Sequence, residues 1–473
     1  MRIKSAGSIC FSAVLFLFMG VFSAMGVAGP APIELHFQPE ETVLGDVIPF
    51  FWDGIYHIFY LRGSGWGHIS SKDLVHWEEL PNAIESGQEA DAPDRENCWT
   101  GSIVEHGGVF HLFYTGKNSR DPKGDQKVMH ATSHDLITWT KRHEDTFYAD
   151  GSIYWNKSIN GPIDNKLIYH HQAFRDPEVF WSDTTGDWRL LLHAALADGS
   201  APAIALYSSD DLTHWKPEQP LLVLPKTSSG DCPHLFEMNN RWYLLSAEHH
   251  YTSSENPLGP FAVTMRTFDT GDLFVPKTMF DGKRRILFGW IGHREENRDE
   301  GKPLWGGVLS MPREMFTDTE GNLCQRPVQE VVNVFDRTVL NRPGGPISSQ
   351  ILSVPEDFML HCEIRSASNQ GKVALRFRQT ASDEESGYHL KIDLGNNTVD
   401  LGGARFQYQQ VVGLNESNPV SVDLFVMGSV CECFVENSYC FTMRIYNFPN
   451  GGVSFPEIDP GVEIRNFQVK TLE

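Results

Sequence analysis

Short stretches of alternating apolar and polar residues recur along the first two thirds of the chain, each beginning with a tight-turn signal. Pairs such as Asp-Gly, Gly-Gly and Asn-Asn stand at the start of these stretches, and this combination predicts β-hairpins. The five hairpin segments are WDGIYHIFY (52–60), HGGVFHLFY (106–114), TGDWRLLLH (185–193), MNNRWYLLS (238–246) and DGKRRILFG (281–289).

A second motif, Asp-Leu-x-x-Trp, recurs beside three of these hairpins, at SKDLVHW (71–77), SHDLITW (133–139) and SDDLTHW (209–215). Another apolar strand precedes each hairpin, so strands come in sets of about four, five times over. Five such sets are typical of a five-bladed β-propeller, and a large β-sandwich with coincidental hairpins is the alternative. We expect the tryptophans of the repeated motif, Trp77, Trp139 and Trp215, to have a packing role in the blades.

The pattern changes after residues 305–315. Residues 331–346 have the composition of a connector, and from about residue 350 short alternating strands with Asn/Gly turns predict a β-sandwich. We therefore expect an all-β protein with a five-bladed β-propeller at residues 32–335, followed by a C-terminal β-sandwich at residues 345–473.

The N-terminal residues have the pattern of an export signal. Arg2 and Lys4 precede an apolar run that small residues follow, which predicts a secretory signal peptide over residues 1–28. A membrane anchor is the alternative for this run, and no second apolar run is long enough to span a bilayer. The protein is expected to be secreted, either extracellular or periplasmic, with no membrane partner after signal cleavage.

Charge and cysteine content narrow the range of ligands. The formal net charge is −22, which disfavours nucleic acid and anionic membranes but suits a neutral ligand such as a sugar. Seven cysteines follow the signal segment, so at least one free thiol is expected unless chains are cross-linked. No CxxC pair and no spacing of acids specifies a metal site, so neither a metal nor a cofactor is expected. The sequence leaves the oligomeric state open.

Three aspartates occupy matching places in the predicted first strands of three sets: Asp46 in GDVIP, Asp176 in FRDPE and Asp231 in GDCPH. The innermost strands of a propeller line a central funnel, so acids from different blades can meet at its axis. Two carboxylates suffice to cleave a glycosidic bond: one protonates the leaving oxygen, and the other, about 5–5.5 Å away in a retaining enzyme, attacks the anomeric carbon. Taken singly, these residues also fit a turn residue, a structural partner of Arg175 and a loop acid.

Longer motifs make the chain resemble glycoside hydrolase family 32, the fructan- and sucrose-cleaving β-fructosidases that include invertases and levanases. The resemblance covers nearly the whole chain after the signal segment. It is carried by FRDPEVFW, WGHISSKDLVHW, CWTGSIVEHGGVFHLFYTG, RRILFGW with WGGVLSMPREM, and VDLFVMGSVCECFVENSYCFTMRIY.

By this resemblance, Asp46 corresponds to the catalytic nucleophile, Asp176 to the transition-state stabiliser and Asp231 to the acid/base. Two departures mark a divergent member: the usual Asn-Asp-Pro-Asn-Gly is Gly-Asp-Val-Ile-Pro here, and the usual Glu-Cys-Pro is Asp-Cys-Pro. The shorter acid sets the carboxyl back by one C–C bond, about 1.5 Å. Because a proton donor must lie within roughly 3 Å of its target, weaker catalysis is expected unless the strand shifts or the substrate sits deeper.

Five further residues are candidates for sugar contact. Trp66, Trp99 and Trp305 lie near Gly-rich turns, and aromatic faces stack on the CH groups of sugars. Arg175 has the geometry to hold a hydroxyl or Asp176. His68 is a candidate for the funnel wall, and the three tryptophans and His68 fit the blade core equally well.

Together these features predict a secreted retaining glycoside hydrolase that cleaves fructofuranosyl linkages, as in sucrose, inulin or levan, through a fructosyl-enzyme intermediate. A fructotransferase or another furanosidase stays open because the residues around Asp46 are altered. The alternative of a different class is a catalytically impaired propeller that binds carbohydrate.

Overall fold

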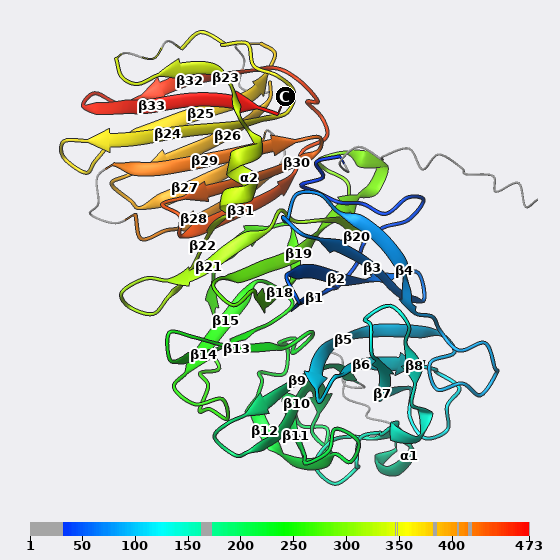
Figure 1. Ribbon diagram of the computed structural model, residues 1–473. Helices are drawn as coiled ribbons and strands as arrows, with labels where there is room; N and C mark the ends of the chain where they lie inside the picture. Colours follow the sequence, from blue (N-terminus) through cyan, green and yellow to red (C-terminus); the bar gives the residue numbers. More distant parts are fainter. Residues whose placement is uncertain are drawn as a thin grey trace, which may run out of the picture.

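The computed structural model describes residues 32–161, 173–345, 347, 349–381, 386–403, 406–414 and 419–472. The predicted signal peptide at residues 1–28 lies outside these ranges. Figure 1 shows two all-β parts, an N-terminal part coloured blue to green and a C-terminal part coloured yellow to red. In the described residues, no helix has the length and apolar character needed to cross a bilayer.

Within the described residues, the N-terminal part consists of five antiparallel sheets, which are the blades of the expected propeller. Blade 1 contains β1 (Val47–Trp52), β2 (Ile55–Arg62), β3 (Gly65–Ser71) and β4 (Glu78–Ile84). Blade 2 contains β5 (Asn97–His106), β6 (Val109–Lys117), β7 (Gln126–Ser133) and β8 (Thr140–Lys141). Blade 3 contains β9 (Phe174–Ser182), β10 (Asp187–Ala195), β11 (Pro202–Ser209) and β12 (Lys216–Val223).

The last two blades follow the same order. Blade 4 contains β13 (His234–Met238), β14 (Arg241–Leu245), β15 (His250–Ser254) and β16 (Arg266–Thr267). Blade 5 contains β18 (Leu273–Phe280), β19 (Arg285–Arg294), β21 (Arg313–Thr317) and β22 (Leu323–Pro327), and β20 (Pro303–Leu309) pairs with β19. All five predicted hairpins are confirmed as the first two strands of a blade.

The innermost strands of the blades form a closed ring. Strand β1 contacts both β18 and β5. The Val179 backbone N–H of β9 donates to Ser102 Oγ of β5 at 2.9 Å. His234 of β13 bridges Glu178 of β9 at 2.6 Å and Thr278 of β18 at 2.8 Å. The five strands therefore surround one axis, as the propeller prediction requires.

The Asp-Leu-x-x-Trp motif joins neighbouring blades. Trp139 of blade 2 lies edge-on against Phe59 of blade 1, with ring centroids 6.0 Å apart. Trp215 of blade 3 meets Phe113 of blade 2 in the same way at 5.6 Å, and Trp77 of blade 1 meets Phe288 of blade 5 at 6.0 Å. The predicted packing role of these tryptophans is confirmed, and the last contact closes the ring between its first and last blades.

The C-terminal part is a sandwich of two sheets whose facing side chains form one apolar core. The order of the first sheet is β17 (Asp269–Gly271), β31 (Tyr439–Arg444), β30 (Val430–Val435), β29 (Val420–Met427), β24 (Phe358–Ser366), β33 (Val462–Thr471) and β23 (Arg337–Arg342). The order of the second is β28 (Gln407–Val411), β27 (Thr398–Gly403), β26 (Tyr388–Asp393), β25 (Lys372–Gln379) and β32 (Gly452–Ile458).

The division between the two parts differs in detail from the expected one. The segment expected to be a connector contains α2 (Gln329–Val334) and then β23, which is an edge strand of the sandwich. Residues of β17, which precede the last blade in sequence, pair in parallel with β31 at the other edge. The remaining short helices are α1 (Lys157–Asn160), η1 (His143–Asp145) and η2 (Glu295–Asn297).

A fully buried arginine links the two parts. Arg313 of β21 donates to Asp269 Oδ2 at 2.6 Å and, through Nε, to Glu432 of the sandwich at 2.8 Å. Because an unpaired buried charge is costly, this network holds blade 5 and the sandwich in one arrangement. All seven cysteines in the described residues are free thiols, so no disulfide contributes there.

The ring-closing contact gives a stability prediction. Trp77→Ala should lower the free energy of unfolding by about 3–5 kcal/mol, because it removes a buried ring between blades 1 and 5. The matched control Trp181→Ala removes an indole that is 44% exposed, and it should cost much less. Denaturant unfolding of both variants measures the difference, and equal losses would contradict the role of Trp77 in ring closure.

Candidate active site

The three aspartates come together near the propeller axis. Asp46 directly precedes β1, Asp176 lies in β9, and Asp231 stands three residues before β13. The thiol of Cys232 lies between the first two, with Sγ 3.7 Å from Asp46 Oδ2 and 3.5 Å from Asp176 Oδ2. Arg175 lies between the last two, with Nε 3.7 Å from Asp176 Oδ2 and 2.9 Å from Asp231 Oδ1. Cys232 and Arg175 therefore link the three carboxylates.

Asp46 is a buried carboxylate surrounded by hydrogen-bond donors. The Trp290 indole N–H donates to Oδ1 at 2.9 Å, and the Thr100 hydroxyl donates to Oδ2. Burial raises the pKa of Asp46, while the bonds from Thr100 and Trp290 and the charge of Lys277 oppose that rise. These donors favour the ionised form that a nucleophile needs.

A β-bulge aims the Thr100 hydroxyl at Asp46. The register of β5 against β6 shifts between Trp99 and Gly101, so Thr100 falls outside the regular pairing. Bulges are a common means of redirecting a side chain beside an active site. Gly101 permits this one, because a Cβ there would lie 1.8 Å from the Phe113 carbonyl oxygen.

Asp176 is more deeply buried than Asp46 and is surrounded by charge of both signs. Its Oδ2 accepts the Cys232 backbone N–H at 3.1 Å, and its own N–H donates to the Thr115 hydroxyl at 2.7 Å. Burial raises the pKa of Asp176 to about 7; the Arg175 guanidinium opposes this rise, and the charges of Asp231 and Asp46 add to it. A cation that arrives beside this carboxyl would favour its ionised form.

Within the described residues, the Asp231 carboxylate contacts the side chains of Arg175 and His193. Arg175 donates to Oδ1 from Nε at 2.9 Å and from a terminal nitrogen at 2.6 Å. His193 of β10, which is completely buried, brings Nδ1 to 2.6 Å from the same oxygen. Arg175 of β9 and His193 of β10 thus both bind the Oδ1 atom of Asp231, the acid that is shorter than the usual Glu. Arg175 pairs with this acid more closely than with Asp176, its neighbour in sequence.

Trp305 is placed to offer an aromatic surface beside Asp46. Its indole is 52% exposed and lies 6.1 Å from the Trp290 ring, measured between centroids. Gly45 makes room for it, because a Cβ at that position would lie 2.3 Å from the Trp305 ring. Trp99 is partly exposed next to Thr100. Both tryptophans remain candidates for stacking on a sugar.

Trp66 and His68 belong to the blade core, which corrects the expectation that they contact sugar. The Trp66 side chain is 0% exposed and donates its indole N–H to the Trp99 carbonyl at 3.2 Å. His68 is 1% exposed, stacks on Phe59 and lies 2.9 Å from His57. Full burial leaves neither ring a face for a ligand, and the alternation along β3 did not reveal this because that whole strand is covered.

Several contact residues of the site were not found from the sequence. Thr100, His193 and Trp290 each contact one of the three aspartates, and the thiol of Cys232 contacts two of them. Thr100 and Cys232 adjoin residues that the sequence did single out, so their neighbourhood was a usable signal. His193 and Trp290 lie on second strands of blades, where the apolar alternation looks like ordinary core.

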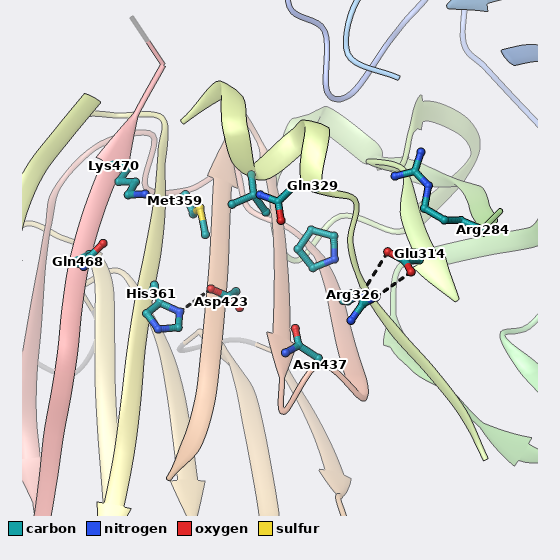
Figure 2. Close-up of a pocket in the computed structure, with 12 residues that line it drawn as sticks. Arg284, Glu314, Arg326, Gln329, Met359, His361, Asp423, Asn437, Gln468 and Lys470 are labelled. Atoms are coloured by element: carbon teal, nitrogen blue, oxygen red, sulfur yellow. Dashed lines mark hydrogen bonds and ion pairs between the residues drawn. The ribbon is translucent and has the colours of Figure 1, made fainter. Parts of the chain in front are cut away.

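A separate cavity of about 670 Å³ lies between blade 5, α2 and the sandwich. Figure 2 shows its polar wall, where Arg326 binds Glu314 at 2.8 Å and His361 binds Asp423 at 2.7 Å. None of the three aspartates lines this cavity. The candidate catalytic residues lie near the propeller axis instead.

The raised pKa of Asp176 predicts a pH-dependent stability effect. The folded protein binds the Asp176 proton up to about pH 7, whereas the unfolded chain releases it near pH 4, so ionisation of this group lowers stability as pH rises between those values. Asp176→Asn removes this penalty. Its melting temperature should therefore exceed that of the parent protein by several degrees at pH 8, and by much less at pH 4.5.

The matched control is Asp135→Asn in a surface turn. Backbone N–H groups of Thr138 and Ile137 lower the pKa of Asp135 to about 2, so this variant should lose a constant amount of stability from pH 5 to pH 8. A stability difference for Asp176→Asn that does not change with pH would contradict the burial argument.

Comparison with known proteins adds to this geometry. The profile described as "Glycosyl hydrolases family 32 N-terminal domain" matches residues 36–327. Among curated proteins, the chain is 27% identical to the beta-fructofuranosidase insoluble isoenzyme CWINV6 of Arabidopsis thaliana, over 65% of this chain and 61% of that protein. It is 29% identical to the raffinose invertase of Escherichia coli, over 59% of this chain and 61% of that protein. These alignments thus span less than two thirds of either relative.

Solved structures share the fold over nearly the whole length. Fructan 1-exohydrolase IIa from Cichorium intybus superposes with a TM-score of 0.72 at 21% identity, covering 93% of this chain and 96% of that one. Sucrose-6-phosphate hydrolase from Lactobacillus gasseri gives a TM-score of 0.71 at 21% identity, with 94% of each chain covered. Since the family profile spans most of the propeller, this chain belongs to glycosyl hydrolase family 32, as a divergent member.

Proposed function

We propose that the protein is a glycoside hydrolase that cleaves fructofuranosyl linkages such as those of sucrose, inulin or levan. The observation that carries the proposal is the connected cluster of Asp46, Asp176 and Asp231 near the propeller axis of a family 32 chain. The relatives are named as a beta-fructofuranosidase and an invertase, which supports fructosyl transfer to water as the reaction class.

Asp46 is proposed to be the nucleophile. Its donors, Trp290 and Thr100, hold the two carboxylate oxygens in fixed directions. Attack on the anomeric carbon forms a fructosyl ester and breaks the bond to the leaving oxygen, with retention of configuration after the second displacement. Trp305, exposed beside Gly45, is proposed to stack on the fructose ring or on its leaving group.

Asp176 is proposed to stabilise the positive charge that develops on the sugar ring. Its carboxyl is oriented by the Cys232 backbone N–H and is too buried to rotate into solvent. In a site shielded from water, a fixed negative charge beside an oxocarbenium-like centre gains strength exactly when that charge develops, which is what transition-state stabilisation requires.

Asp231 is proposed to be the acid/base. In the first step its proton goes to the leaving oxygen; in the second, it accepts a proton from the attacking water. Arg175 and His193 hold Oδ1 of this acid, and in our proposal they set its direction in place of the longer side chain that the family usually has.

The export signal predicted at residues 1–28 supports action outside the cytoplasm. Relatives named as insoluble and cell-wall isozymes agree with this location. We propose an extracellular or periplasmic enzyme acting on a neutral sugar, with no nucleic-acid partner.

A carbohydrate-binding propeller without turnover is the second candidate. Arg175 and His193 both engage Asp231 Oδ1, and an arginine contact favours the ionised carboxylate, which has no proton to give. Product analysis on sucrose, inulin and levan separates the candidates, since release of free fructose by the wild-type protein excludes the second.

Asp46→Asn tests the nucleophile. The amide keeps the shape and the bonds to Oδ1 but cannot form the fructosyl ester, so fructose release should fall at least 10³-fold while the melting temperature is retained. Asp53→Asn, the same change in an exposed hairpin turn, should keep full activity. Wild-type turnover by Asp46→Asn would refute the proposed role of this residue.

Asp231→Asn tests proton donation. With sucrose, kcat should fall by about 10²–10⁴, the usual contribution of general acid catalysis. With β-D-fructofuranosyl fluoride, whose leaving group needs little protonation, the first step should be much less affected. Equal losses on both substrates would show that Asp231 acts through structure rather than through its proton.

A further inference from the structure

Three residues within or just before neighbouring innermost strands leave the extended conformation. Asp176 has φ of 64°, Cys232 of 49° and Val275 of 48°, all in the left-handed region. Non-glycine residues rarely adopt this region, and a β-branched residue such as Val275 is a clear outlier. Strain of this kind persists only where the surroundings enforce it.

The enforcing groups stand two residues further along each strand. These positions are Glu178, His234 and Lys277, and all three side chains are buried. Each strained residue is thus followed by a polar side chain that meets the others below the candidate site.

The three side chains bind one another directly. Glu178 Oε1 lies 2.6 Å from His234 Nδ1, and Glu178 Oε2 accepts from Lys277 Nζ at 2.9 Å. His234 Nε2 accepts the Thr278 backbone N–H at 3.0 Å, so the His234 proton resides on Nδ1 and is donated to Glu178. Strands β9, β13 and β18 are joined at this level.

Lys277 also connects the network to the donor of Asp46. Its Nζ donates to the Gly101 carbonyl at 2.8 Å, next to Thr100, whose hydroxyl binds Asp46. Below the network, a cavity of about 210 Å³ opens between the innermost strands, away from the aspartates. The network therefore forms the floor that separates the candidate site from this second cavity.

Charged groups on the surrounding strands influence the protonation of Glu178 and His234 in this network. Burial would raise the pKa of Glu178, but Lys277 and His234 hold it below its ordinary value. Burial lowers the pKa of His234, which keeps the ring neutral. Side chains that interact with Lys277 include Glu178 and His234 within the network, and Asp46 and Cys232 above it. Arg285 of β19 acts on Glu178 and His234.

We propose that Glu178, His234 and Lys277 are positioning residues, which hold the strained backbone at Asp176, Cys232 and Val275 and thereby aim the site groups at Asp46. The proposal rests on the hydrolase function proposed above. A buried ion pair contributes little net stability when compared with apolar replacements, so its value here is one of conformation.

The test compares Lys277→Met and Glu178→Gln with the matched control Lys127→Met. Lys127 is equally buried and pairs with Asp121 at 2.9 Å, outside the three innermost strands of the network. We expect the two network variants to lose at least tenfold in kcat on sucrose with little change in KM. Lys277→Met should also shift the acidic limb of the kcat/KM profile to higher pH. Lys127→Met should lose melting temperature but keep kcat and the pH profile.

Unchanged kcat and pH profile in both network variants would overturn the proposal. If Lys277→Met does not fold, the double variant Glu178→Gln/Lys277→Met removes both charges at once and is judged by the same loss of kcat. An infrared difference spectrum against Asp46→Asn follows the Asp46 carboxyl without turnover. Its titration should move to higher pH in Lys277→Met, and no movement overturns the inference. A wild type that releases no fructose while this shift is present overturns only the proposed function.

Discussion

Convergence of five β-strands on one axis is the constraint from which the candidate site follows. Each blade contributes its first strand to the ring, and edge-on Trp–Phe contacts join blade 1 to blade 2, blade 2 to blade 3 and blade 5 to blade 1. Strands that approach an axis bring their side chains into a small volume from which water is largely excluded. Residues 130 or more apart in sequence, such as Asp46 and Asp176, therefore share one thiol contact at Cys232.

Burial of like charges at this axis works against stability. Burial raises the pKa of both Asp46 and Asp176, and the surrounding donors and Arg175 only partly oppose this. The backbone around the cluster departs from regular structure, with a bulge at Thr100 and left-handed residues at positions 176 and 232. Such local departures from regular structure are common at active sites, where stability is given up for a fixed geometry.

The sandwich is built into the propeller rather than attached to it. Strand β17 lies between blades 4 and 5 in the sequence but forms an edge of the sandwich sheet, where it pairs with β31. Arg313 of blade 5 binds Glu432 of the sandwich. These contacts surround the segment that leads into β18, the strand that carries Lys277. The sequence suggested a connector at residues 331–346, where the structure places α2 and β23, because apolar alternation indicates that a strand exists and not which sheet it joins.

The sequence by itself determined the hairpins, the five-fold repetition, the packing role of the repeated tryptophans and the three aspartates at equivalent places, because turn chemistry and residue spacing are local properties. It did not separate Trp305, which is exposed beside Gly45, from Trp66, which is enclosed in the core, since both stand next to glycines. Only the tertiary structure decided that Arg175 pairs more closely with Asp231 than with Asp176, that His193 meets the same oxygen, and that Glu178 binds Lys277 below the site. These contacts join residues on different strands or blades, and their existence depends on ring closure, which no local pattern encodes.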